Sequence, residues 1–131
     1  MTKDIILVDD EKDILTILSH IFSDLGWEPY VALNATDAIE LFKNIIPPLV
    51  ITDLRLEDGV GGVSVCKMIK DMAPLTLCVA MSGYFSEDYS ISHLRRNGFD
   101  HMMEKPVKQE ECARLAGVAV RCRTQWDELM K

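Results

Sequence analysis

The stretch Leu49–Asp53, with the sequence LVITD, constrains the fold of this chain more than any other. Leu49, Val50 and Ile51 form an apolar run that lacks the polar alternation of a strand with one face in water. Such a run is typical of a strand that is covered on both faces of a parallel sheet. Because the stretch ends in Asp53, it also places a carboxylate at the end of a buried strand.

Three other apolar runs are built in the same way, with polar residues soon after the last apolar one. Residues 5–8 lead into Asp9, Asp10 and Glu11, residues 75–81 lead into Ser82, and residues 102–103 lead through Glu104 into Lys105. In an open parallel sheet, the crevice for a ligand lies beyond the carboxyl ends of the strands. We therefore expect these polar residues to gather around Asp53.

Segments with helical periodicity separate the strands. They run through residues 13–25, 38–42, 65–72, 86–97 and from about 108 toward the C-terminal end, and a further strand is expected over 27–33. Gly26 and Gly98 are placed to end two of the helices, and Asn34 is placed to cap the start of another. Strands that alternate with helices through short connections predict an α/β fold: a doubly wound, five-stranded parallel sheet with five helices, in three layers.

The composition narrows the class of protein. A chain of 131 residues that is 48% hydrophobic and 27% charged has the size and balance of one globular domain. Its net charge of -7 argues against direct binding to nucleic acid, because no basic excess is available to neutralise phosphates. No apolar run reaches the length of a membrane span, so we expect a cytoplasmic protein. We interpret its four cysteines as reduced core thiols: Cys66, Cys78, Cys112 and Cys122.

The acidic strand ends indicate a metal site. Asp9 and Asp10 alone would be as typical of a polar strand terminus, but beside Asp53 the three carboxylates would repel one another. Mg²⁺ would relieve that repulsion, since it prefers hard oxygen ligands and readily adds a phosphoryl oxygen. Ser82 and Lys105, which singly would be read as a turn residue and a surface charge, would act here as donors to one anion. The set predicts that Asp53 accepts a phosphoryl group whose charge Mg²⁺ and the two donors neutralise.

Four motifs carry a resemblance to a known family: VDDE at 8–11, Asp53 in ITDLRL, MSG at 81–83 and EKP at 104–106. With them the chain resembles the receiver domains of two-component response regulators, including the chemotaxis receivers. The resemblance implies a flavodoxin-like sheet of order 2-1-3-4-5, a receiver domain over residues 1–122 and a C-terminal extension of the last helix over 123–131. It also implies a sensor histidine kinase or a histidine phosphotransfer protein as partner, and catalysis only of the protein's own phosphorylation and dephosphorylation.

The resemblance also assigns roles to the residues at the strand ends. Asp53 is expected to be the phosphoacceptor, and Asp9 and Asp10 are expected to hold Mg²⁺ beside it. The backbone carbonyl of Arg55 would supply a further metal ligand. The Lys105–Pro106 bond is expected to be cis.

Further positions would sense or modulate the phosphoryl group. Ser82 stands where the family has its switch hydroxyl, and Lys105 where it has the lysine that contacts the phosphoryl group. Arg55 and Tyr84 would flank the path of the attacking water, and because both are bulky we expect slow self-dephosphorylation. Met102 departs from the Tyr or Phe that is common at its position, which removes the ring that usually rotates inward on activation.

Two other functions stay open at this point. A phosphatase of the haloacid dehalogenase type also uses an aspartyl nucleophile and Mg²⁺, but its D-x-D signature is absent because the first strand ends in Asp9, Asp10 and Glu11. A receiver-like scaffold would bind partners without phosphorylation, and the intact set of site residues argues against it.

The last helix carries a further pattern. Apolar residues recur at alternating steps of three and four, as in a coiled-coil seam, at Cys112, Leu115, Ala119, Cys122, Trp126 and Leu129. The sheet is not expected to cover the last two of them. We therefore expect self-association, or a connection to an output domain, through the last two helices.

Overall fold

A computed structural model describes residues 2–56, 61–83 and 90–130 of the chain. Its sheet contains the strands β1 (Asp4–Val8), β2 (Glu28–Ala32), β3 (Leu49–Asp53), β4 (Leu77–Ser82) and β5 (His101–Glu104). Each neighbouring pair is parallel, and the order is β2-β1-β3-β4-β5. This order confirms the flavodoxin-like topology that the resemblance implied.

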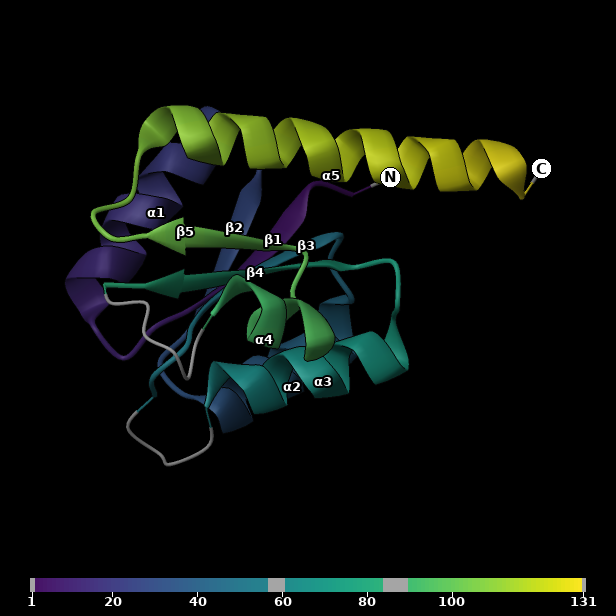
Figure 1. The fold of residues 1–131 in the computed structure, drawn as a ribbon. Helices are drawn as coiled ribbons and strands as arrows, with labels where there is room; N and C mark the ends of the chain where they lie inside the picture. The colour runs from purple at the N-terminus through teal and green to yellow at the C-terminus, as the bar shows by residue number, and fades with distance from the viewer. Residues whose placement is uncertain (1, 57–60, 84–89, 131) are drawn as a thin grey trace.

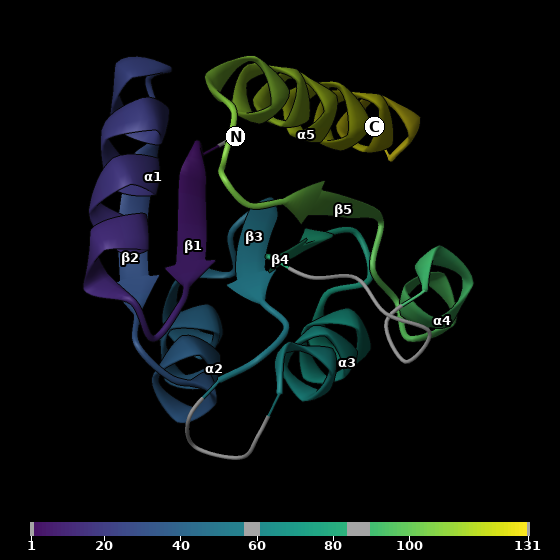
Figure 2. The ribbon, with the colours of Figure 1, turned by 60° about the vertical axis from the view of Figure 1, so that its left-hand side comes forward.

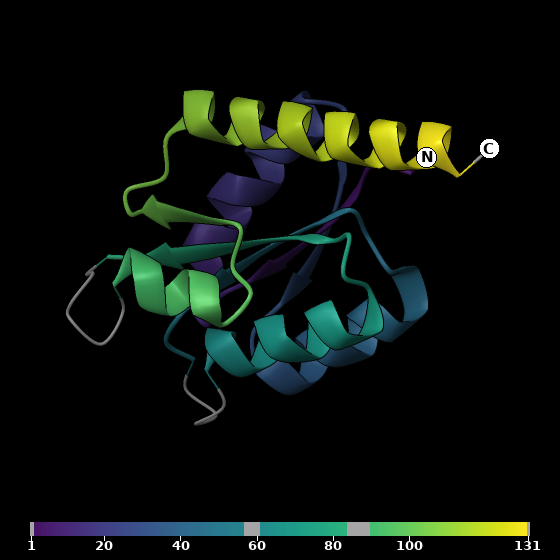
Figure 3. The same cartoon turned by 45° about the vertical axis from the view of Figure 1, so that its right-hand side comes forward.

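The helices lie on both faces of the sheet and give the predicted three layers. They are α1 (Lys12–Asp24), α2 (Ala35–Ile45), α3 (Gly62–Met72), α4 (Ile91–Arg96) and α5 (Gln109–Leu129). Helices α1 and α5 cover one face, and α2, α3 and α4 cover the other (Figures 1 and 2). Figure 3 shows β4 and β5 pointing in the same direction, with α5 above them and α3 and α4 below.

The core follows from the alternation of side chains along the strands. In β1, Ile5 and Leu7 belong to the cluster beneath α1 and α5, whereas Ile6 and Val8 belong to the cluster beneath α2, α3 and α4. All of β3 is buried, as its unbroken apolar run predicted. Leu49, Val50 and Ile51 each contribute about 1.5–3 kcal/mol by leaving water, so the strand that carries Asp53 is held firmly in place.

Local signals in the sequence set the ends of the helices. The side chain of Asn34 accepts a hydrogen bond from the N–H of Asp37 at 2.8 Å, which caps α2 as predicted. Gly26 and Gly98 have positive φ angles of 88° and 99°, which glycine adopts without strain, and they end α1 and α4. The predicted start of the fourth helix at residues 86–88 lies outside the described residues, and α4 is capped by Ser90.

Helix α5 divides into a covered half and an uncovered half. Cys112, Leu115 and Ala119 are buried against the sheet. The C-terminal part of the helix extends past the sheet (Figure 1), and Trp126 in that part is exposed. Cys122 is also exposed, so its interpretation as a core thiol was wrong, because the residue lies beyond the part of α5 that packs on the sheet.

The other three cysteines are buried, as predicted, and all four are free thiols. The Lys105–Pro106 bond is cis, also as predicted. Across the part of the chain that the structure describes, no helix combines the length and the apolar character that crossing a membrane requires.

Candidate functional site

The polar residues at the strand ends meet in one pocket beyond the carboxyl edge of the sheet. Asp53 ends β3, Ser82 ends β4, Asp9 and Asp10 directly follow β1, and Lys105 directly follows β5. The residues that line the pocket are Asp10, Glu11, Asp53, Arg55, Ser82, Gly83 and Lys105. The parallel topology thus brings together residues that are up to about a hundred positions apart in the sequence.

Asp9 lies beneath the pocket and is fully buried. Its Oδ1 accepts a hydrogen bond from the N–H of Glu11 at 2.9 Å, which fixes the carboxylate at the start of the β1–α1 turn. Its Oδ2 lies 3.0 Å from the Lys105 ammonium, but outside hydrogen-bond geometry. Among the described residues, this oxygen therefore has an ionic neighbour and no hydrogen-bond donor.

Asp53 is held by two donors on different elements. Its Oδ1 accepts a hydrogen bond from the N–H of Arg55 at 3.3 Å, and its Oδ2 accepts one from Lys105 Nζ at 3.2 Å. The residue is 8% exposed, so its carboxylate reaches the pocket while its backbone remains inside the sheet.

Lys105 is the cation that faces both carboxylates. Burial lowers the pKa of its ammonium, but the close contact with Asp9 and the charges of Asp53 and Asp9 outweigh burial, so the pKa is raised above its usual value. Lys105 is consequently charged at neutral pH and supplies one positive charge to the site.

The arrangement of the acids fits a divalent cation. Asp9, Asp10 and Asp53 each offer a carboxylate oxygen, and these oxygens lie within 4.8 Å of one another. One of these carboxylates belongs to Asp9, whose buried Oδ2 accepts no hydrogen bond from the described residues. Lys105 balances only one of the three negative charges, and hard oxygen ligands of this kind suit Mg²⁺.

The remaining predicted residues take different places. Ser82 is buried, and its backbone carbonyl accepts a hydrogen bond from the N–H of Lys105 at 2.9 Å, which ties β4 to the start of the β5–α5 turn. Arg55 is exposed at the rim of the pocket. Met102 is half-buried and packs against the core beneath α4, away from the pocket. Tyr84 lies outside the described residues.

Two residues of the site were missed from the sequence. The hydroxyl of Thr52 donates to the backbone carbonyl of Asp53 at 3.0 Å, inside the protein. The backbone of Gly62, at the start of α3, lies against the same carbonyl. The only signal for either was a threonine in an apolar strand and a glycine in a glycine-rich loop, and neither shows which atoms it contacts.

The comparisons with known proteins agree with this geometry. The profile of the response regulator receiver domain matches residues 5–116. A putative NtrX-like response regulator of Rickettsia bellii is 29% identical over 109 residues, which cover 82% of this chain and 23% of that protein. The chain thus spans about a quarter of the length of the curated relatives that it matches first.

Solved structures show the same fold. The receiver domain of NtrX from Brucella abortus is 31% identical, with a TM-score of 0.82, and the match covers 90% of this chain and 98% of that one. The beryllofluoride-activated NtrC4 receiver domain dimer is 27% identical, with a TM-score of 0.82 and coverage of 90% and 96%. The chain therefore belongs to the receiver domain family of response regulators in two-component signal transduction.

Proposed function

We propose that this receiver domain accepts a phosphoryl group on Asp53, with Mg²⁺, from a sensor histidine kinase or a histidine phosphotransfer protein. The observation that carries the proposal is the geometry at Asp53, whose carboxylate lines an open pocket and is bonded by Lys105 at 3.2 Å. Two further carboxylates stand close enough to share a cation with it.

In the proposed step, a carboxylate oxygen of Asp53 attacks phosphorus. The bond from phosphorus to the donor's imidazole nitrogen breaks, and the imidazole keeps the electron pair. The product is an aspartyl phosphate. Asp53 is oriented for this attack by Arg55 N–H on one oxygen and Lys105 on the other, and Lys105 remains beside the added phosphoryl oxygens to offset their charge.

Asp9, Asp10 and Asp53 would hold the Mg²⁺, and the backbone carbonyl of Arg55 stays the predicted further ligand. When bound, the cation supplies positive charge to the carboxylates and to the phosphoryl oxygens. The hydroxyl of Ser82, at the end of β4, is the proposed donor that follows the phosphoryl group and links its presence to β4.

Incubation with phosphoramidate and Mg²⁺ tests the proposal. The unchanged chain should gain one phosphoryl group, and Asp53→Asn should gain none, with Asp24→Asn on the exposed end of α1 as the matched control. Mg²⁺ should also raise the unfolding midpoint of the unchanged chain, because it binds the folded state, and Asp9→Asn should lose that rise. Labelling of Asp53→Asn at the full level would contradict the proposal.

The lifetime of the aspartyl phosphate is a second part of the proposal. Arg55 lies at the pocket rim, where its side chain can obstruct the in-line approach of water to phosphorus. Tyr84 is proposed to act with it. Replacing both with small residues should speed the loss of the phosphoryl group, and an unchanged half-life would reject the shielding role.

The exposed end of α5 is the proposed contact to a second copy of the chain. Trp126, Leu129 and Met130 are exposed by 41%, 79% and 66%, and no other described element packs over them. A related receiver domain, that of NtrC4, is described as a dimer. An apolar stripe of this kind favours a partner, which could also be an output segment of a longer protein.

Sedimentation distinguishes these partners. The full chain should associate in a manner that depends on phosphorylation, whereas Trp126→Ala and a chain truncated after Arg121 should remain monomeric. Monomers in every sample would exclude self-association and leave the connection to an output domain.

A phosphorylation-independent scaffold is the alternative within the family. It predicts that Asp53→Asn binds the partner as well as the unchanged chain does, with or without phosphodonor. The family match gives no support to the haloacid dehalogenase alternative.

A further inference from the structure

The start of α3 lies directly against the main chain of Asp53. The N–H of Gly62 donates to the carbonyl of Leu54 at 3.2 Å. A Cβ atom on Gly62 would overlap the carbonyl oxygen of Asp53 and would lie 3.1 Å from its carbonyl carbon. These are backbone atoms of a buried strand, so they cannot move aside as the end of a flexible side chain can. The close approach therefore requires glycine at this position.

The same peptide group is fixed from two other directions. The hydroxyl of Thr52 donates to the carbonyl of Asp53 at 3.0 Å, and the N–H of Leu54 donates to the carbonyl of Met81 in β4 at 3.1 Å. Leu54 itself is buried in the core. The Asp53–Leu54 peptide is thus held by β3, β4 and α3 together.

We propose that Gly62 is a positioning residue for the phosphorylation of Asp53, an inference that rests on the proposed function. A side chain at position 62 displaces the Asp53–Leu54 peptide, and the Asp53 carboxylate moves with it. The contacts that depend on that position are the bond from Arg55 N–H, at 3.3 Å, and the bond from Lys105, at 3.2 Å. Phosphoryl transfer requires in-line geometry, and a displacement of about 1 Å can slow such a reaction about 100-fold.

Two other glycines give graded comparisons. A Cβ atom on Gly61 would lie 3.2 Å from the carbonyl oxygen of Leu54, which is a tight contact rather than an overlap. A Cβ atom on Gly117, in α5 and away from the pocket, would meet the end of the flexible Arg121 side chain at 3.3 Å. Gly117→Ala is therefore the matched control, since it also replaces a helical glycine.

The experiment measures the initial rate of phosphorylation by phosphoramidate with saturating Mg²⁺, per folded molecule. We expect a fall of about 10- to 100-fold for Gly62→Ala, a fall of a few-fold for Gly61→Ala and no more than about a twofold change for Gly117→Ala. A second readout is the amide resonance of Arg55 without metal. It should shift in Gly62→Ala, because this N–H donates to the Asp53 carboxylate.

A purely structural role would lower the unfolding midpoint and leave both readouts unchanged. A folded Gly62→Ala protein with an unchanged rate and an unshifted Arg55 amide overturns the inference. If Gly62→Ala does not fold, Gly61→Ala decides, and an unchanged rate there overturns it. If the unchanged chain takes no phosphoryl group, the proposed function fails, and the Arg55 amide alone then supports or overturns the role of Gly62.

Discussion

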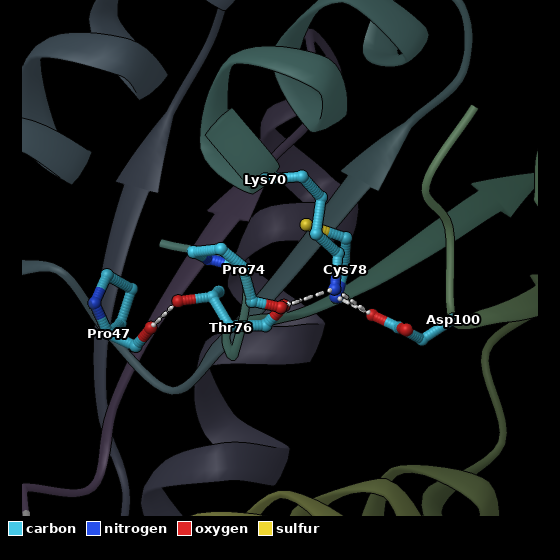
Figure 4. Close-up of polar contacts among 6 residues, drawn as sticks. All are labelled: Pro47, Lys70, Pro74, Thr76, Cys78 and Asp100. Atoms are coloured by element: carbon cyan, nitrogen blue, oxygen red, sulfur yellow. Dashed lines mark hydrogen bonds and ion pairs between the residues drawn. The ribbon is translucent and has the colours of Figure 1, made fainter. Parts of the chain in front are cut away.

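Lys70 and Lys105 lie at opposite ends of the strands, and the charges and hydrogen-bond partners around them differ. Lys70, near the end of α3, donates to the carbonyls of Thr76 and Pro74 at 2.8 Å and 3.3 Å and to Asp100 at 2.7 Å (Figure 4). The Asp100 carboxylate also accepts the N–H of Cys78 at 2.9 Å. This Lys70 cluster lies at the amino end of β4, away from the pocket. The three ammonium hydrogens of Lys70 all have acceptors, and one oxygen of the Asp100 carboxylate accepts two hydrogen bonds.

Lys105 stands in the opposite situation. It faces Asp9 at 3.0 Å and Asp53 at 3.2 Å, with Asp10 close to both, so one cation meets three carboxylates. Among the described residues, the buried Asp9 oxygen accepts no hydrogen bond. Three carboxylates this close together repel one another, which a purely structural cluster would avoid. The excess of carboxylates at Lys105 therefore fits a cation site, whereas the pairing at Lys70 indicates a structural role.

The largest expected effect is on phosphorylation. Lys105→Met keeps the length of the side chain but removes its charge, and the charge-assisted contact that it makes is worth about 1.5–3 kcal/mol. The rate of phosphorylation by phosphoramidate should therefore fall by about 10- to 150-fold. Lys70→Met should phosphorylate within about twofold of the unchanged chain, because its cluster does not touch the pocket. Equal losses in the two variants would show that the two lysines do not differ in role.

The next effect is on the free energy of unfolding. Lys70→Met leaves Asp100 and the carbonyl of Thr76 without their shared donor, in a region where Thr76 is buried and also donates to the carbonyl of Pro47 at 2.8 Å. The unfolding free energy in urea should fall by about 1–2 kcal/mol, less than for a fully buried pair because Asp100 is 38% exposed.

Lys105→Met is the comparison for this measurement. It removes a cation from beside three carboxylates, and saturating Mg²⁺ should restore part of the stability that it loses. Mg²⁺ should stabilise Lys70→Met only as much as it stabilises the unchanged chain, because the pocket of this variant is intact, so the difference between those two proteins should remain. If Mg²⁺ stabilised Lys105→Met no more than it stabilised the unchanged chain, the cation would not replace the charge that Lys105 supplies to these carboxylates.

The two clusters also show what the sequence can predict. The residues around Lys105 were predicted because strand ends are visible as apolar runs, and a parallel topology places those ends at one edge. The Lys70 cluster was not predicted. Its acceptors come from residues 74, 76 and 100, two of them are backbone carbonyls, and no spacing marks such contacts. The contact of Gly62 with Asp53 was hidden for the same reason.

The exposed Cys122 shows a related limit. The spacing of apolar residues along α5, in steps of three and four, continues past the point where the sheet ends. Periodicity alone therefore does not say how much of a helix the sheet covers. The pattern therefore predicted the burial of Cys112 correctly and that of Cys122 wrongly, although the exposure of Trp126 was expected from the length of the helix.

The smallest expected effect is the loss of stability at alkaline pH, when Lys105 loses its proton. Its pKa is raised because the contact with Asp9 and the two nearby carboxylate charges outweigh burial. A raised pKa means that the folded state binds this proton more tightly than the unfolded state does. The stability that Lys105 contributes is therefore fully present below the unfolded pKa of about 10.4, and is lost as the pH rises through the folded pKa above that value.

Chemical unfolding without metal measures this contribution as the difference in free energy between the unchanged chain and Lys105→Met. The difference should stay constant from about pH 7 to about pH 10 and should shrink at higher pH, because only the unchanged chain then loses the charge that offsets the carboxylates. Subtraction removes the alkaline titration of the groups that both proteins share. A difference that began to shrink well below pH 10 would mean that burial, rather than Asp9 and Asp53, sets the pKa of Lys105, and the contrast with the evenly paired Lys70 cluster would lose its electrostatic basis.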